Sequence, residues 1–178
     1  MTPDTNTDVE SASASGERPQ RGRWRLTAWA LLIAVVVVVI DQGTKVWAEA
    51  TLSEHERIPL IGDLLGLQLA YNPGAAFSFG ESFTWVFALI AVAATATAIV
   101  FAFRVRSPGW AIVIGALGGS AASHAGDRLF RQPGFAQGHV VDFLAYGNWF
   151  IGNIADIVIV TATIARALLM LRGTGSQE

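Results

Sequence analysis

The chain has 178 residues, which is enough for one domain. Hydrophobic residues make up 52% and charged residues only 15%. With glycine counted, the apolar share is roughly 62%, against about 45–50% in ordinary soluble domains, which indicates a membrane protein. A formal net charge of -2 provides no basic surface for a polyanion, so nucleic-acid binding is not expected. The absence of cysteine excludes disulfides, thiolate nucleophiles and cysteine metal ligands.

The N-terminal region joins a polar tail to a first apolar helix. Residues 1–22 are polar, and we expect a disordered cytoplasmic tail there. Arginines at its end precede an apolar run, residues 26–40, which ends at Asp41. The run spans a membrane if the helix continues beyond Asp41. A secretory signal peptide is the alternative, because residues 48–50 (AEA) resemble a cleavage site, but the long tail ahead argues against it.

The next region combines a short β element with a second helix. Residues 51–82 contain alternating polar and apolar positions and turn signals at residues 62–63 and 72–74. They predict a small extracytoplasmic element of strands and turns. Residues 83–103 contain no charge and form the clearest transmembrane helix of the chain.

Two more apolar segments follow. Residues 110–125 are rich in glycine and alanine at spacings that let helices approach closely, and Asp127 follows them. After a polar loop, residues 151–171 form a fourth span that holds Asp156. We therefore expect an all-α membrane protein with four transmembrane helices and a small β-rich element between the first two. The membrane domain is expected to cover residues 23–172, and residues 173–178 to form a short cytoplasmic tail.

The arginines predict the orientation. They precede the first span, separate the second from the third, and close the fourth. Because basic residues favour the cytoplasmic side, these segments and both termini are expected inside. The other two loops hold most of the acids of the folded part and are expected to face outward.

Three aspartates lie at one depth in the membrane. Asp41, Asp127 and Asp156 lie 16, 17 and 16 residues from the inner-edge markers Arg25, Trp110 and Arg172. At about 1.5 Å per residue all three are roughly 24–26 Å above the inner edge, near the outer limit of the hydrocarbon core. Each would be costly against lipid, so we expect them to face one another. The alternative is that acids at helix ends are only interfacial.

Asp127 and Asp156 form the predicted reactive pair. A helical hairpin brings the end of one helix and the start of the next together, around a water molecule. Two close carboxylates cannot both ionise cheaply, so the pair would share one proton. One group then acts as a general base and the other as a general acid, which suits amide hydrolysis by direct attack of water.

Five segments carry a family resemblance. They are residues 41–45 (DQGTK), 72–77 (NPGAAF), 127–131 (DRLFR), 140–143 (VVDF), and Trp149 with residues 153–156 (NIAD). They resemble the motifs of the lipoprotein signal peptidases (signal peptidase II), which are four-helix membrane aspartyl proteases. The resemblance implies that Asp127 and Asp156 are the catalytic dyad. It implies supporting or substrate-binding roles for Asp41, Lys45, Asn72, Gly74, Arg128, Asp142 and Asn153.

Two positions depart from these motifs. Ser123 and His124 replace the usual Gly-Asn, and Gly152 with Asn153 replaces the usual Phe-Asn. His124 lies one helical turn before Asp127, where it either replaces the missing asparagine as a donor or pairs with the dyad as a cation and disturbs its proton. The chain is then either a working enzyme with altered efficiency or a divergent member with weak or no activity.

Several smaller features can be explained either by a structural role or by a functional one. Lys45 lies one turn after Asp41 and either neutralises it or faces substrate. Residues 72–74 are either a simple turn or part of the peptide site. His55 and His139 are expected to be solvated loop residues. A metal site is not expected, because no two histidines have ligand spacing.

The resemblance implies a bacterial endopeptidase of the cell membrane. It would remove signal peptides from diacylglyceryl-modified prolipoproteins, cleaving before the lipidated cysteine, with its site near the outer face. Its partners would be these substrates and membrane lipid, and we expect no cofactor and a monomer. The alternatives are a non-catalytic lipoprotein-binding relative and a small proton-coupled transporter, although transport favours acids nearer the bilayer midplane.

Overall fold

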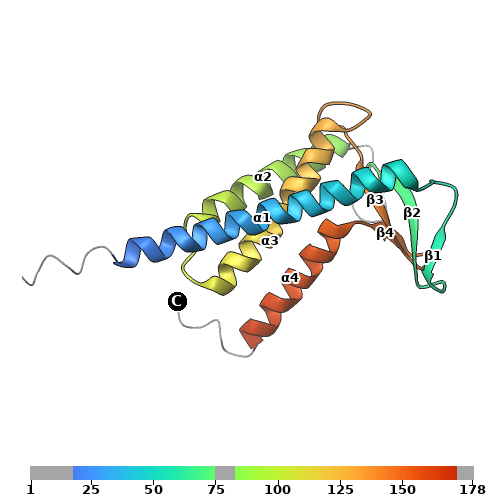
Figure 1. Cartoon of the computed structure of the whole chain (residues 1–178). Coiled ribbons are helices and arrows are strands. Elements are labelled where there is room, and N and C mark those ends of the chain that lie inside the picture. The colour runs from blue at the N-terminus through green and yellow to red at the C-terminus, as the bar shows by residue number, and fades with distance from the viewer. Residues whose placement is uncertain (1–17, 75–82, 172–178) are drawn as a thin grey trace, which may run out of the picture.

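The computed structural model describes residues 18–74 and 83–171, which form a helical bundle with a sheet at one end (Figure 1). The helices are α1 (Arg18–Thr51), α2 (Thr84–Ala102), α3 (Pro108–Phe130) and α4 (Ile154–Leu171). The strands are β1 (Ile58–Ile61), β2 (Leu65–Asn72), β3 (Val140–Tyr146) and β4 (Phe150–Gly152). The sheet lies beyond the C-terminal end of α1, on the side where α4 begins.

The helix α3 is the centre of the bundle, in contact with α1, α2 and α4. Two glycines on α3 let α1 approach closely. A Cβ atom at Gly115 would lie 2.5 Å from the carbonyl oxygen of Ala30, and one at Gly119 would lie 2.6 Å from that of Ala34. The close helix approach predicted from the small residues of this segment is therefore confirmed.

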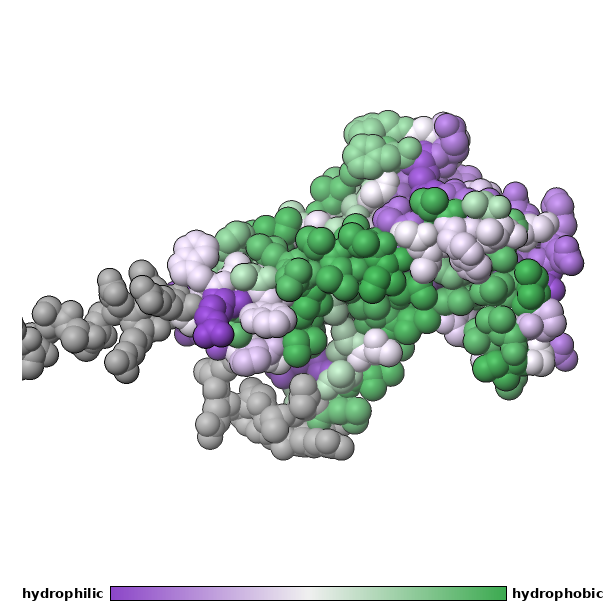
Figure 2. Space-filling view, in the orientation of Figure 1, coloured by the Kyte–Doolittle hydropathy of each residue, from purple (hydrophilic) through white to green (hydrophobic). Residues whose placement is uncertain are grey.

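The outer surface of the bundle is apolar. Large side chains such as Val39 and Leu89 are more than half exposed, at 64% and 61%. In Figure 2 the hydrophobic side chains cover the middle of the molecule, and the hydrophilic ones gather toward its two ends. Among the described residues, two helical segments are long and apolar enough to cross a membrane, Gly22–Thr51 and Thr84–Ala102. These are the first two spans expected from the sequence, and their exposed side chains suit contact with lipid.

The sheet is built from two separate hairpins. Its order is β1-β2-β3-β4 with antiparallel neighbours, and β2 pairs with β3 between Leu65↔Tyr146 and Asn72↔Val140. The β element expected between the first two helices supplies only β1 and β2. The strand β3 lies where a polar loop was expected, and β4 occupies the expected start of the fourth span. Since β3 is almost entirely buried, it lacks the polar-apolar alternation that identifies a half-exposed strand.

The helix α1 begins at Arg18, within the segment that the sequence analysis assigned to the tail. The rest of that tail, the C-terminal tail and residues 75–77 of the second motif lie outside the described residues.

Candidate active site

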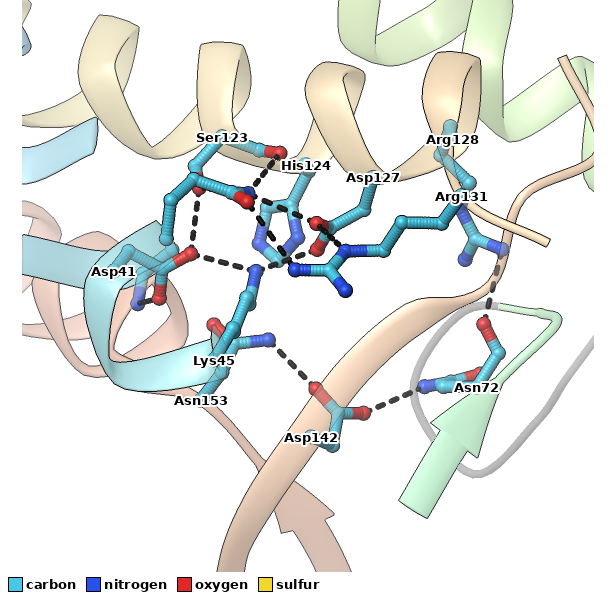
Figure 3. Close-up of polar contacts among 12 residues, drawn as sticks. Asp41, Lys45, Asn72, Ser123, His124, Asp127, Arg128, Arg131, Asp142 and Asn153 are labelled. Atoms are coloured by element: carbon cyan, nitrogen blue, oxygen red, sulfur yellow. Dashed lines mark hydrogen bonds and ion pairs between the residues drawn. The ribbon is translucent and has the colours of Figure 1, made fainter. Parts of the chain in front are cut away.

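A buried cluster of charges joins α1 to α3. The Nζ atom of Lys45 lies 2.6 Å from a carboxylate oxygen of Asp41 and 2.6 Å from one of Asp127, and all three side chains are fully buried (Figure 3). The Nε atom of Arg131 donates to the other oxygen of Asp127 at 2.6 Å. Asp127 therefore lies between two cations, which compensate the cost of burying its charge.

Further hydrogen bonds tie this cluster to the ends of two helices. Ser123 donates its hydroxyl to Asp41 Oδ2 at 2.6 Å, and the backbone N–H of Ala155 donates to Asp41 Oδ1 at 2.7 Å. Asp41 thereby links α1 to α3 and to the first turn of α4. The three helices therefore meet around Asp41.

The first turn of α4 brings Asp156 close to Asp142 through Asn153. The side chain of Asn153 accepts the N–H of Asp156 at 3.1 Å, and its own N–H donates to Asp156 Oδ2 at 3.0 Å, which is a reciprocal helix cap. The Nδ2 atom of Asn153 donates to Asp142 Oδ1 at 2.6 Å. One buried asparagine thus contacts both carboxylates.

Asp142 is an almost fully buried acid on β3, with 2% exposure. Its second oxygen accepts the Nδ2 amide of Asn72 at 3.2 Å. Burial, followed by the negative charge of Asp156, raises the pKa of Asp142 to about 6. Asp142 therefore holds a proton far more readily than an ordinary aspartate does.

Arg128 holds the turn that follows β2. The Oδ1 atom of Asn72 accepts the N–H of Gly74 at 3.0 Å, forming an Asx-turn. The buried guanidinium of Arg128 donates to the carbonyl oxygens of Asn72 at 3.0 Å and Pro73 at 2.8 Å, and also to those of Gly74 and Gly138. This turn is therefore fixed beside Asp142.

A cavity of about 390 Å³ lies beside the two linked carboxylates. Its polar lining comes from Asn72, His124, Arg128, Asp142, Asn153 and Asp156. Its apolar lining includes Phe87 of α2 and Ile159 and Val160 of α4. A carboxylate pair beside an apolar wall suits the hydrolysis of a substrate with an apolar part.

The structure separates the two aspartates that the sequence analysis paired. Asp156 lines the cavity, whereas Asp127 is buried in the charge cluster and is not part of the cavity lining. Within the described ranges no hydrogen bond joins them. The acid that shares the cavity with Asp156 is Asp142, which the sequence analysis placed among the supporting residues. An aspartate inside a buried apolar strand is costly, and this cost was the available sequence signal.

The other predicted site residues divide between the cavity and the cluster. Asn72, Gly74, His124, Arg128 and Asn153 line the cavity, and Asp41 and Lys45 belong to the buried cluster. Sequence reasoning missed three partners of Asp127 and its cluster, namely Gln42, Glu49 and Arg131. The spacing of Arg131, one turn after Asp127, was a signal for this contact.

Comparison with known proteins places the chain in a family. The family model described as Signal peptidase (SPase) II matches residues 33–172. A protein named lipoprotein signal peptidase from Leifsonia xyli subsp. xyli is 41% identical, and the match covers 94% of this chain and 79% of that protein. One of the same name from Rhodococcus jostii is 40% identical over 96% of this chain and 84% of its own length.

A solved structure shows a similar fold. It is a bacterial membrane enzyme with a TM-score of 0.70 and 26% sequence identity, and the match covers 84% of this chain and 91% of that one. The profile match covers most of the chain and includes every residue of the cavity and of the buried cluster. The chain therefore belongs to the signal peptidase II family.

Proposed function

We propose that this protein is a lipoprotein signal peptidase, an aspartic endopeptidase of the bacterial membrane that removes signal peptides from prolipoproteins. The observation that carries this function is the cavity in which Asp142 and Asp156 are linked through Asn153. Membership of the signal peptidase II family and the relatives named lipoprotein signal peptidase support it.

Asp142 and Asp156 are the catalytic pair of this proposal, in place of Asp127 and Asp156. Asp142 is the proton donor of the proposed pair, because its pKa, raised to about 6, keeps part of the molecules protonated near neutral pH, and Asp156 is the general base. Asp156 takes a proton from a water molecule whose oxygen attacks the carbonyl carbon of the scissile amide. Asp142 donates its proton to the carbonyl oxygen as the tetrahedral centre forms. As the C–N bond breaks, the proton held by Asp156 passes to the leaving nitrogen, and Asp142 takes its proton back from the hydroxyl group that becomes the new carbonyl.

The substrate class follows from the cavity walls. Phe87, Ala91, Ile159 and Val160 form an apolar side of the cavity, on helices whose outer faces suit lipid. A diacylglyceryl-modified cysteine keeps its acyl chains along this apolar side, while the peptide bond before it reaches the two carboxylates. The turn held by Arg128 borders the same space and contacts the peptide.

The proposed topology has four spans and both termini in the cytoplasm. Residues 23–172 form the membrane peptidase domain between cytoplasmic tails at residues 1–22 and 173–178, and the protein acts as a monomer. Arg23, Arg25 and Arg106 surround one cavity at the end of the bundle opposite the sheet, which supports a cytoplasmic location for that end. The active site then lies near the outer face.

A cleavage assay with four variants tests the catalytic pair. Asp142→Asn and Asp156→Asn are expected to lower kcat for a lipidated prolipoprotein peptide by about 10³-fold or more while the protein still inserts. Asp63→Asn, in an exposed turn of the sheet, is the matched control and keeps full activity. Asp127→Asn is expected to lower the thermal stability of the protein, because it leaves the buried charge of Lys45 partly uncompensated, while the protein that remains folded stays active. Normal cleavage by Asp142→Asn, or loss of cleavage in a fully stable Asp127→Asn, contradicts the pair.

A further inference from the structure

His124 is a titratable group of the cavity that the proposed reaction does not use. It lies on α3, it lines the cavity, and its Nε2 atom is 3.4 Å from Asp156 Oδ1. Its side chain is 19% exposed, so it is neither a solvated surface histidine nor a sealed core residue. The imidazole therefore lies at the edge of the cavity, in contact with the carboxylate of Asp156.

The two oxygens of Asp156 have different partners. Oδ2 accepts the backbone N–H of Asn153 from the start of its own helix, and Oδ1 faces His124 from the neighbouring helix. The Asp156 side chain is 42% exposed, the most open carboxylate of those described at the site. A carboxylate with a hydrogen bond to only one oxygen can still rotate about its Cβ–Cγ bond. A second donor, on the other oxygen, restricts this rotation.

We propose that His124 is a positioning residue for Asp156, in which a neutral imidazole donates its Nε2–H to Oδ1 and keeps this carboxylate oriented toward the attacking water. The proposal rests on the proposed function and adds a regulation of the same site. Nδ1 carries no proton in the active form. Protonation of Nδ1 makes the ring a cation and weakens Asp156 as a base, because the positive charge opposes uptake of a proton from water.

The charged groups around His124 explain why protonation of its imidazole would affect Asp156. Asp156 faces it from α4, Asp142 borders the same cavity from β3, and Arg128 follows one turn later on α3. Lys45 of α1 and Asp127 of α3 lie behind the cavity and are already paired with each other. Asp156 is thus the acid in direct contact with the imidazole, and a proton gained by His124 acts first on the proposed base.

The test compares His124→Asn, a neutral donor, with His124→Leu, which has no donor. We expect His124→Asn to keep kcat within about threefold of wild type at pH 8, and His124→Leu to lose about 10- to 100-fold in kcat with little change in KM. Wild-type kcat/KM is expected to depend on pH through the dyad and through His124. His124→Asn retains only the dyad ionisation. Identical pH profiles for wild type and His124→Asn, or full activity of His124→Leu, overturn the proposal.

A second measurement does not depend on catalysis. In protein labelled with ¹⁵N-histidine, the ring nitrogen shifts report which nitrogen carries hydrogen, and the His124 signals are those that His124→Asn removes. We expect the Nε2–H form at neutral pH and a clear change of these shifts in Asp156→Asn, with none in Asp63→Asn. Unchanged shifts in Asp156→Asn overturn the proposal even if the enzyme cleaves lipoproteins. If these shifts behave as expected but the protein cleaves no prolipoprotein, the proposed function is refuted instead.

Discussion

At the scale of single residues, Lys45 explains why Asp127 lies outside the cavity. Its ammonium group bridges Asp41 and Asp127 in a region without solvent exposure. Removing one member of such a buried cluster leaves an uncompensated charge, at a cost of about 3–5 kcal/mol. Asp127 is therefore held where its negative charge stabilises the packing of α1 on α3.

Asp142 differs from Asp127, because over residues 18–74 and 83–171 no cation is in direct contact with its buried carboxylate. Its raised pKa of about 6, against 3.8 ordinarily, means that the folded protein binds this proton more tightly than the unfolded chain does. The stability it contributes is fully present below about pH 4 and is lost as the pH rises through about 6, a decline on the order of 3 kcal/mol.

This decline predicts a pH-dependent difference between wild type and Asp142→Asn. Because the amide does not titrate, the variant is expected to gain stability relative to wild type by about 3 kcal/mol between pH 4 and pH 7.5. Thermal unfolding in detergent across this pH range measures the difference, and subtracting the two proteins removes the titration of the other acids. A difference that is constant with pH, or that shrinks, contradicts the raised pKa.

At the scale of elements, the close packing of α1 against α3 depends on glycines of α3, which have no side chain to separate the two helices. Gly119→Ala places a methyl group 2.6 Å from a backbone oxygen of α1, which cannot give way without moving the helix. Gly126→Ala, on the same helix, meets nothing closer than a side-chain nitrogen at 4.0 Å and is the matched control.

We expect Gly119→Ala to lower the free energy of unfolding by about 1–3 kcal/mol through overpacking. Gly126→Ala is expected to be neutral or to gain up to about 1 kcal/mol from its helix propensity. Thermal unfolding of the two variants in the same detergent distinguishes these outcomes. Equal midpoints for both variants would show that α1 and α3 do not pack as closely as the structure has them.

The elements also show what the sequence could predict. Long apolar runs and the arginines beside them located the helices, because each helix is judged from its own residues. The sheet was only half predicted, since β3 pairs with a strand about 70 residues earlier in the chain and is buried by that pairing. The acid that shares the cavity with Asp156 was not predicted for the same reason, because Asp142 reaches the cavity through this long-range strand pairing and its hydrogen bond to Asn153.

At the scale of the whole molecule, the charges are separated along the bundle. The end of the bundle opposite the sheet carries Arg23, Arg25 and Arg106, and the described acids lie toward the sheet end, from Asp41 onward. A bias of lysine and arginine toward one side is what orients a membrane protein during insertion.

The proposed orientation can be measured directly, because the chain has no cysteine of its own. Glu54→Cys lies after α1 beside the sheet, and Gly109→Cys lies at the start of α3, where a side chain meets no neighbour within 4 Å. On intact cells a membrane-impermeant maleimide is expected to label the first variant and not the second. Both are labelled after permeabilisation, and labelling of Gly109→Cys alone on intact cells would reverse the topology.

The order of the elements along the chain has a consequence for biosynthesis. The sheet needs β3, which leaves the ribosome after α3, and Asp156 belongs to the last helix to emerge. Asp41 remains without its partner on α4 until Ala155 arrives. A chain synthesised only as far as α3 therefore lacks both Asp142 and Asp156, so the cavity that contains the proposed catalytic pair cannot form until α4 has been made.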